Sequence, residues 1–317
     1  KKGDEVVTSP ITFPSTVNMI ENCGAKPVFV DVDLETGLMD PGFIERVVTK
    51  RTRVIIPVHL YGRPCNLDSI WGIARKYNLF VLEDAAEALG AEYNNRKIGS
   101  KSDLVAFSFA VNKVITAAEG GMLAINRREL VSKIKMFVLH GMNKGALKKY
   151  PYKGFTEHFV QVSGLKYNMT DVHAAVGLSQ LSRINNLFKR RKQIWEMYNE
   201  NLVDLPLKRP KPLEKGMKHG RCFYAIQLNL EKLSVDRNTV QKALLAEGIG
   251  TAIHFFPMHL QPYYVKKYGY VRLNFPNAEH FAARTLSLPL ATDISDNDLE
   301  DITKAVRKVL LYYSSNK

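Results

Sequence analysis

Short apolar runs rich in β-branched residues alternate with helical patterns over the first two thirds of the chain. Apolar residues at helical spacing predict a helix from Leu67 to Tyr77, and Asp40 before Pro41 is typical of a helix start. This alternation predicts an α/β fold with a mostly parallel central sheet flanked by helices. The predicted strands are Glu5–Thr8, Pro27–Asp31, Val54–Val58, Leu79–Glu83, Leu104–Phe109 and Gly121–Ile125.

The last third has a different pattern. Helical periodicity from Thr170 to Trp195 leads into a proline- and lysine-rich stretch, Pro206–Lys218. We therefore expect a large domain over residues 1–200 and a smaller C-terminal α+β domain over residues 201–317. The elements predicted in the smaller domain are strands Phe223–Leu228, Thr251–Phe255 and one near Thr285–Leu288, and helices Asn238–Glu247 and Asn297–Leu311.

Composition narrows the class of protein. A hydrophobic content of 45% with 24% charged residues is typical of a soluble globular chain, and no window is apolar enough for a membrane span. The first residues lack the pattern of a signal peptide, so a cytoplasmic location is expected. The three cysteines, Cys23, Cys65 and Cys222, form no CxxC pair, so we predict neither a disulfide framework nor a metal site.

The chain is basic, with 45 lysines and arginines against 31 acidic residues and a net charge of +14. Such an excess favours anionic partners. The basic residues are scattered, and no finger, RNP or helix-turn-helix pattern accompanies them, so nucleic acid is the weaker interpretation. A phosphorylated small molecule satisfies the charge equally well, and a solvated basic surface is the plain alternative.

Two polar residues follow predicted strands of the sheet. Asp84 ends the run Phe80–Asp84, and Lys113 comes shortly after the strand that contains Ser108. Ligands of open α/β sheets bind outside the carboxyl ends of the strands. Taken singly, an acid at a strand end is more often a helix cap, and a lysine there is more often solvated. Together they predict a binding site.

Short motifs occur in a fixed order along nearly the whole chain: Gly3–Thr8 with Thr12 and Phe13, Glu83–Ala88, Phe107–Phe109 with Lys113, Glu119–Gly121, Tyr167–Asp171 and Gly250–Phe255. Together they are similar to the DegT/DnrJ/EryC1/StrS family of sugar aminotransferases. Two further segments, Pro57–Gly62 and Thr16–Ile20, resemble the branch that aminates UDP-linked 4-keto-pentoses.

The resemblance implies a fold-type I enzyme that uses pyridoxal 5'-phosphate. It implies transfer of an amino group from L-glutamate to a nucleotide-linked keto-sugar by a ping-pong mechanism. Relatives that dehydrate sugars typically carry histidine in place of the lysine, so Lys113 favours the aminotransferase. A regulatory relative without catalysis is the other alternative.

The resemblance also assigns the catalytic residues. Asp84 would face the ring nitrogen of the cofactor and raise its proton affinity, which the cofactor needs as an electron sink. Lys113 would hold the cofactor as an imine and then move the proton between substrate and cofactor.

Further cofactor contacts follow by the same analogy. Phe13 and Ala86 would lie against the two ring faces, although ordinary core packing is the alternative for both. Ser108 would donate to the phosphate. Glu87 would meet the ring hydroxyl, where it needs a proton or a nearby donor.

The remaining contacts involve a second subunit and the substrate. Where many relatives have Asn-Tyr-Arg, this chain has Lys166, Tyr167 and Asn168, so either Lys166 or Asn168 would reach the phosphate of a partner subunit. That contact implies a homodimer with shared active sites. His140 and His254 match positions at the substrate entrance, but a histidine on a strand is more often a satisfied core residue.

Relatives carry a further segment before the Gly3–Thr8 motif, including a loop whose amides cradle the phosphate. This chain begins after it. We therefore expect upstream residues that are absent from the sequence given, because the large domain without them would expose apolar surface.

Overall fold

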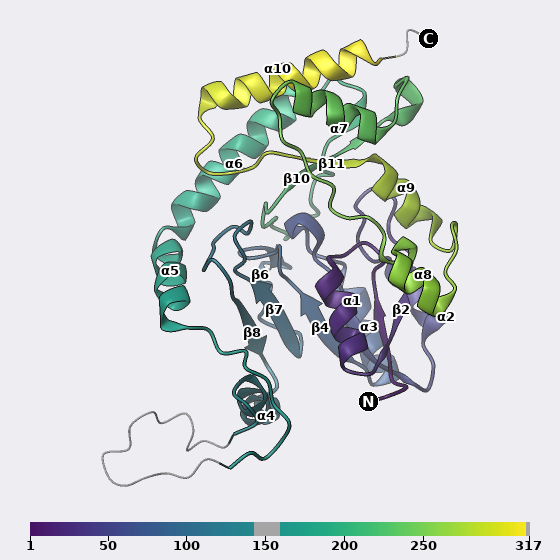
Figure 1. Ribbon diagram of the computed structural model, residues 1–317, viewed down its shortest axis with the longest axis vertical. Coiled ribbons are helices and arrows are strands. Elements are labelled where there is room, and N and C mark those ends of the chain that lie inside the picture. Colours follow the sequence, from purple (N-terminus) through teal and green to yellow (C-terminus); the bar gives the residue numbers. More distant parts are fainter. Residues whose placement is uncertain (143–158, 315–317) are drawn as a thin grey trace.

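A computed structural model describes residues 1–142 and 159–314 (Figure 1). Its centre is a six-stranded sheet in the order β2-β1-β3-β4-β7-β8. All neighbouring strands run parallel except β8, which is antiparallel to β7. The mostly parallel sheet predicted from the sequence is confirmed. The strands are β1 Glu5–Thr8, β2 Lys26–Phe29, β3 Thr52–Ile56, β4 Phe80–Asp84, β7 Leu104–Ser108 and β8 Gly121–Ile125.

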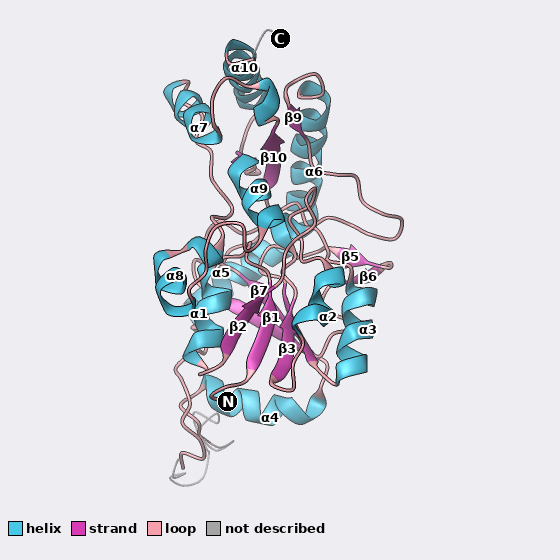
Figure 2. Cartoon of the chain, turned by 90° about the vertical axis from the view of Figure 1, so that its right-hand side faces the viewer, coloured by secondary structure: helices cyan, strands magenta, loops and turns pink. Residues whose placement is uncertain are grey.

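Helices cover both faces of this sheet (Figure 2). Helix α1, Pro14–Asn22, packs Ile20 against Val6 and Ile56 on one face. On the other face, helix α3, Leu67–Tyr77, buries its apolar side against Val7. Successive strand residues point to opposite faces, so adjacent β-branched residues of one strand serve both layers. Two further helices, α2 Ile44–Val47 and α4 Arg128–Val138, complete this part of the chain.

A second hydrophobic core lies above the sheet in Figure 1. It surrounds a three-stranded sheet in the order β11-β10-β9, paired antiparallel throughout. The second half of the long helix α6, including Trp195 and Tyr198, packs into this core. The elements are α5 Asp171–Ser182, α6 Ile184–Asn201, β9 Leu207–Lys208, β10 Tyr224–Leu228, α7 Arg237–Ala246, α8 Pro262–Tyr268, α9 Pro276–Arg284, β11 Thr285–Leu288 and α10 Asp296–Tyr312.

A small hairpin, β5 Glu92–Tyr93 and β6 Arg96–Lys97, projects beside α3. Both residues of its turn, Asn94 and Asn95, have positive φ, which the short polar side chain of asparagine tolerates. No described helix is long and apolar enough to cross a membrane.

The strand predicted over Thr251–Phe255 is wrong. Only Ala252 pairs there, through a single bridge to Ser287 of β11. After this bridge the chain leaves the sheet, because the carbonyl oxygen of His254 accepts a hydrogen bond from the Tyr61 hydroxyl. The segment has the apolar character of a strand since it lines a cavity.

Candidate active site

A cavity of about 750 Å³ opens beside the carboxyl ends of β4 and β7. Asp84 ends β4, and Lys113 follows β7; both line this cavity. Because β4 and β7 are parallel neighbours, the residues at their carboxyl ends are presented at the same edge of the sheet. The fold therefore brings a carboxylate and an amine from separate motifs to one site.

Both oxygens of Asp84 are held in place. Thr16 on α1 donates its hydroxyl to Oδ2 at 2.6 Å, and Thr12 donates to the Thr16 hydroxyl at 3.1 Å. The backbone amide of Ala86 donates to Oδ1 at 3.1 Å. Thr12 lies just before α1 and Thr16 in its first turn, so the two hydroxyls form a short relay of donors directed at the carboxylate. Asp84 consequently has a fixed orientation toward the cavity wall.

Lys113 contacts a second acid. Its Nζ lies 3.4 Å from Oε1 of Glu87, and both side chains are largely buried. The backbone amide of Tyr61 donates to the other oxygen of Glu87 at 2.7 Å. Burial raises the pKa of Glu87, while the positive charge of Lys113 opposes that shift. Glu87 thus holds the lysine amine inside the cavity and is itself poised to carry a proton.

Phe13, Ala86 and Ser108, which the resemblance assigns to cofactor contacts, also line the cavity. Phe13 is 58% exposed, so its side chain is accessible to a ligand in the cavity and is not part of the hydrophobic core. The hydroxyl oxygen of Ser108 accepts a bond from the amide of Ala110, which leaves its proton free for a ligand.

His254 enters the cavity from the C-terminal part of the chain. Its ring stacks on Phe223, with centroids 4.0 Å apart, and its Nδ1 lies 2.9 Å from the Ser287 hydroxyl. Burial, together with the nearby Lys113, lowers the pKa of His254 to about 4. At neutral pH the imidazole is therefore uncharged and offers a hydrogen bond without adding charge.

Three of the predicted site residues lie elsewhere in this chain. His140, Lys166 and Asn168 are exposed and do not line the cavity. His140 follows α4 in a left-handed backbone conformation, and Lys166 donates to Asn168. The structure of one chain thus does not bring these three residues to the site.

Sequence reasoning missed Thr16 and Tyr61 as site residues. Thr16 occurs in a segment noted for its similarity to one branch of the family, but not for a role of its own. Tyr61 has positive φ, which aims its amide at Glu87. The presence of two threonines four residues apart, at and just before the start of α1, could have pointed to Thr16, whereas no local sequence pattern predicts the role of Tyr61.

Comparison with known proteins agrees with this geometry. Residues 1–307 match the family model described as the DegT/DnrJ/EryC1/StrS aminotransferase family. Over 310 residues the chain is 44% identical to the spore coat polysaccharide biosynthesis protein SpsC of Bacillus subtilis, covering 97% of this chain and 79% of SpsC. It is 43% identical to the uncharacterized protein MJ1066 of Methanocaldococcus jannaschii, covering 98% of this chain and 80% of that protein.

Solved structures of aminotransferases share the fold, among them the following two. PseC of Helicobacter pylori, an aminotransferase involved in the biosynthesis of pseudoaminic acid, superposes with a TM-score of 0.90 at 29% identity, covering 98% of this chain and 81% of PseC. The PMP form of Spr1654 of Streptococcus pneumoniae also has a TM-score of 0.90, at 30% identity, covering 98% of this chain and 83% of that one. The chain thus belongs to the DegT/DnrJ/EryC1/StrS aminotransferase family, as its ordered motifs predicted.

Proposed function

We propose that this chain is a pyridoxal-phosphate-dependent enzyme that transfers an amino group from L-glutamate to a nucleotide-linked keto-sugar by a ping-pong mechanism. The supporting observation is that the carboxylate of Asp84 and the amine of Lys113 line one cavity. PseC and SpsC act in the biosynthesis of sugars or polysaccharides, which favours a sugar as the amino acceptor. Spr1654 is known in both PLP and PMP forms.

The residues present fit this cofactor. Pyridoxal phosphate, when bound, supplies an electron sink for the substrate carbon. Asp84 would hold a proton on the ring nitrogen, and its two fixed oxygens suit that single contact. Phe13 and Ala86 would cover the ring faces, and the free proton of the Ser108 hydroxyl would meet the phosphate.

Lys113 would bind the cofactor covalently and move the proton at the substrate carbon. Glu87 lies at hydrogen-bonding distance from the lysine amine and would contact the ring hydroxyl. Because burial raises its pKa, Glu87 is able to donate a proton to an anionic oxygen. His254, uncharged near neutrality, would bind a sugar hydroxyl, and His140 would lie at the substrate entrance.

The functional unit would be a homodimer. Helix α5 exposes apolar residues, among them Val172 at 73% and Leu178 at 66%, which suits a subunit interface. Lys166 or Asn168, neither of which lines the cavity of its own chain, would contact the cofactor phosphate of the partner. We assign residues 1–200 to the large domain and 201–317 to the small one.

The decisive variant is Lys113→Ala. It should abolish both the absorbance of the lysine-bound cofactor and turnover, while Lys133→Ala, a change on exposed α4, should leave both intact. Amino transfer is then measured with glutamate against UDP-, dTDP- and GDP-linked keto-sugars. Dehydration of a sugar without incorporation of nitrogen would instead support a dehydratase, and absence of the lysine-bound absorbance in the wild type would support a non-catalytic relative.

A further inference from the structure

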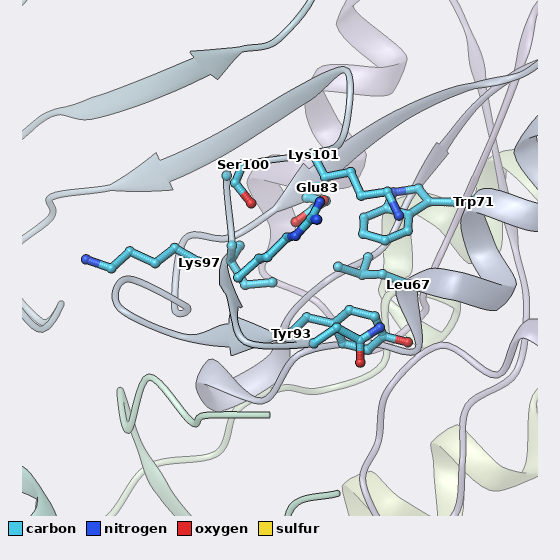
Figure 3. Close-up of a pocket in the computed structure, with 11 residues that line it drawn as sticks. Leu67, Trp71, Glu83, Tyr93, Lys97, Ser100 and Lys101 are labelled. Carbon is cyan, nitrogen blue, oxygen red and sulfur yellow. The ribbon is translucent and has the colours of Figure 1, made fainter. Parts of the chain in front are cut away.

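Two histidines line the cavity of about 750 Å³, and they differ in how their ring nitrogens are used. His59 is fully buried, and both of its nitrogens are engaged within the protein. Its Nε2 lies 2.9 Å from Glu83, a carboxylate that also lines a smaller cavity of about 270 Å³ (Figure 3), and its Nδ1 accepts the backbone amide of Cys65. In His254 only Nδ1 has a partner among the described residues, the Ser287 hydroxyl at 2.9 Å. His254 is therefore the histidine that is able to bond a ligand.

The imidazole of His254 is held with Nε2 open to the cavity. Its ring stacks on Phe223 with 4.0 Å between the centroids and 21° between the planes, and Phe255 lies edge to face with it at 5.1 Å. Over residues 1–142 and 159–314, no group bonds Nε2, and this atom is not sealed within the protein. The Nζ of Lys113 lies over the same Phe223 ring, 5.5 Å from its centroid. Nε2 is thus presented to a ligand beside the lysine amine.

The surroundings of Ser287 decide which nitrogen of His254 carries the ring proton. Ser287 is only 3% exposed, and its backbone amide and carbonyl both pair with Ala252. In the described part of the chain, its hydroxyl bonds no atom other than Nδ1 of His254. A buried hydroxyl whose proton has no acceptor is costly, so Ser287 donates to Nδ1. Burial and the nearby Lys113 lower the pKa of His254 to about 4, so the ring is neutral at neutral pH and its single proton is on Nε2.

We propose that Ser287 is a positioning residue, which fixes His254 as a hydrogen-bond donor to an oxygen of the sugar that accepts the amino group. The inference rests on the proposed function and adds the direction of one substrate contact. With its proton on Nε2, His254 donates to a hydroxyl or carbonyl oxygen and offers no acceptor to an ammonium group. Because the ring carries no charge, it suits an uncharged sugar oxygen better than the carboxylates of glutamate, which favour charged donors. The contact should therefore serve the half-reaction with the sugar.

Nitrogen-15 NMR of the cofactor-bound protein, labelled at histidine, measures the tautomer directly. The signals of His254 are those that disappear in His254→Gln. In the wild type they should show a proton on Nε2 and none on Nδ1, and Ser287→Ala should raise the population with the proton on Nδ1. Ser287→Thr keeps the hydroxyl and should keep the wild-type tautomer. A wild-type ring with its proton on Nδ1, or a tautomer unchanged by Ser287→Ala, would overturn the proposal.

The two half-reactions then separate positioning from general damage. The cofactor absorbance follows conversion by glutamate, and the return by whichever UDP-, dTDP- or GDP-linked keto-sugar the wild type turns over. Ser287→Ala should raise the apparent dissociation constant of the keto-sugar about fivefold, the effect of one neutral hydrogen bond, and change the glutamate half-reaction less than about twofold. Ser234→Ala, at an exposed serine whose hydroxyl donates to the Tyr313 carbonyl, is the matched control and should change neither. Equal loss in both half-reactions, or none in either, contradicts the proposal.

This inference and the proposed function fail in different ways. A wild type that does not transfer the amino group removes both of them. A wild type that transfers the amino group but carries the ring proton on Nδ1 removes only the role of Ser287, because the tautomer is measured without turnover.

Discussion

Replacing Thr16 by valine tests whether the hydroxyl relay to Asp84 serves the cofactor. Valine keeps the size and β-branching of threonine, so α1 and its packing should persist. The change removes the donor at 2.6 Å from Oδ2 and leaves Asp84 with only the longer contact from the Ala86 amide. The carboxylate is then free to turn away from the ring nitrogen that we propose it binds.

The expected magnitude follows from the type of bond. A hydrogen bond to a charged group is worth about 1.5–3 kcal/mol net, and about 1.4 kcal/mol corresponds to a factor of ten in affinity. The partly buried relay is held by Thr12 as well, so the lower part of this range applies. The dissociation constant of pyridoxal phosphate should therefore rise about tenfold in Thr16→Val.

The assay is a titration of apoprotein with pyridoxal phosphate, followed by absorbance. Thr16→Ser keeps the hydroxyl and should shift the dissociation constant by less than about threefold. Thermal unfolding of both variants without cofactor checks that neither effect comes from stability. If valine and serine bind the cofactor equally well, the threonine hydroxyl does not position Asp84, and the reasoning fails.

Two further outcomes are expected. Burial raises the pKa of Glu87, so its folded form holds a proton more tightly than the unfolded chain, and the associated stability is lost as pH rises through the folded pKa. Glutamine does not titrate, so Glu87→Gln should not lose stability in this way. The difference in melting temperature, variant minus wild type, should therefore increase as the pH rises above 4.5, the ordinary pKa of a glutamate. A difference that stays constant with pH would show that the pKa of Glu87 is not raised. Gly62→Ala should lower the unfolding free energy by about 3 kcal/mol, because φ is +99° and the added Cβ would lie 2.7 Å from the Glu87 carbonyl oxygen. Gly72 lies within α3, and a Cβ added there would meet no atom within 4 Å. Gly72→Ala should therefore leave the unfolding free energy unchanged or raise it by up to about 1 kcal/mol in denaturant unfolding. Equal effects of Gly62→Ala and Gly72→Ala would refute the argument.

The central sheet could be predicted because its strands are short apolar runs that alternate with helices, and those helices cover both faces of the sheet (Figure 2). Because ligands bind at the carboxyl ends of such strands, the sequence also predicted that Asp84 and Lys113 lie at one edge of the sheet, where both line the cavity. The secondary structure of the C-terminal segment around residues 251–255 was harder to predict. An apolar run that lines a cavity has the composition of a strand, which is why Thr251–Phe255 was misassigned.

Other features are set by tertiary contacts that no local pattern encodes. The β5–β6 hairpin has two residues in each strand, too few for an alternation to appear, although its Asn94–Asn95 turn is a recognisable type. The helical periodicity from Thr170 to Trp195 is continuous in sequence, yet the helix breaks at Arg183. Helix α5 buries no residue within this chain, whereas α6 packs Ile194, Trp195 and Tyr198 into the second core, a difference that the continuous periodicity does not predict.

Tyr61 connects the central sheet region to the C-terminal part of the chain through hydrogen bonds on both sides. Its backbone amide donates to Glu87 beside Lys113, while its hydroxyl donates to the His254 carbonyl and lies 3.2 Å from the Thr285 hydroxyl at the start of β11. A displacement of the His254 segment or of β11 would therefore act on Tyr61, and through its amide on Glu87. Such a displacement would change the contact between Glu87 and the amine of Lys113. The position of the C-terminal segment and the environment of the amine are thereby coupled through one residue.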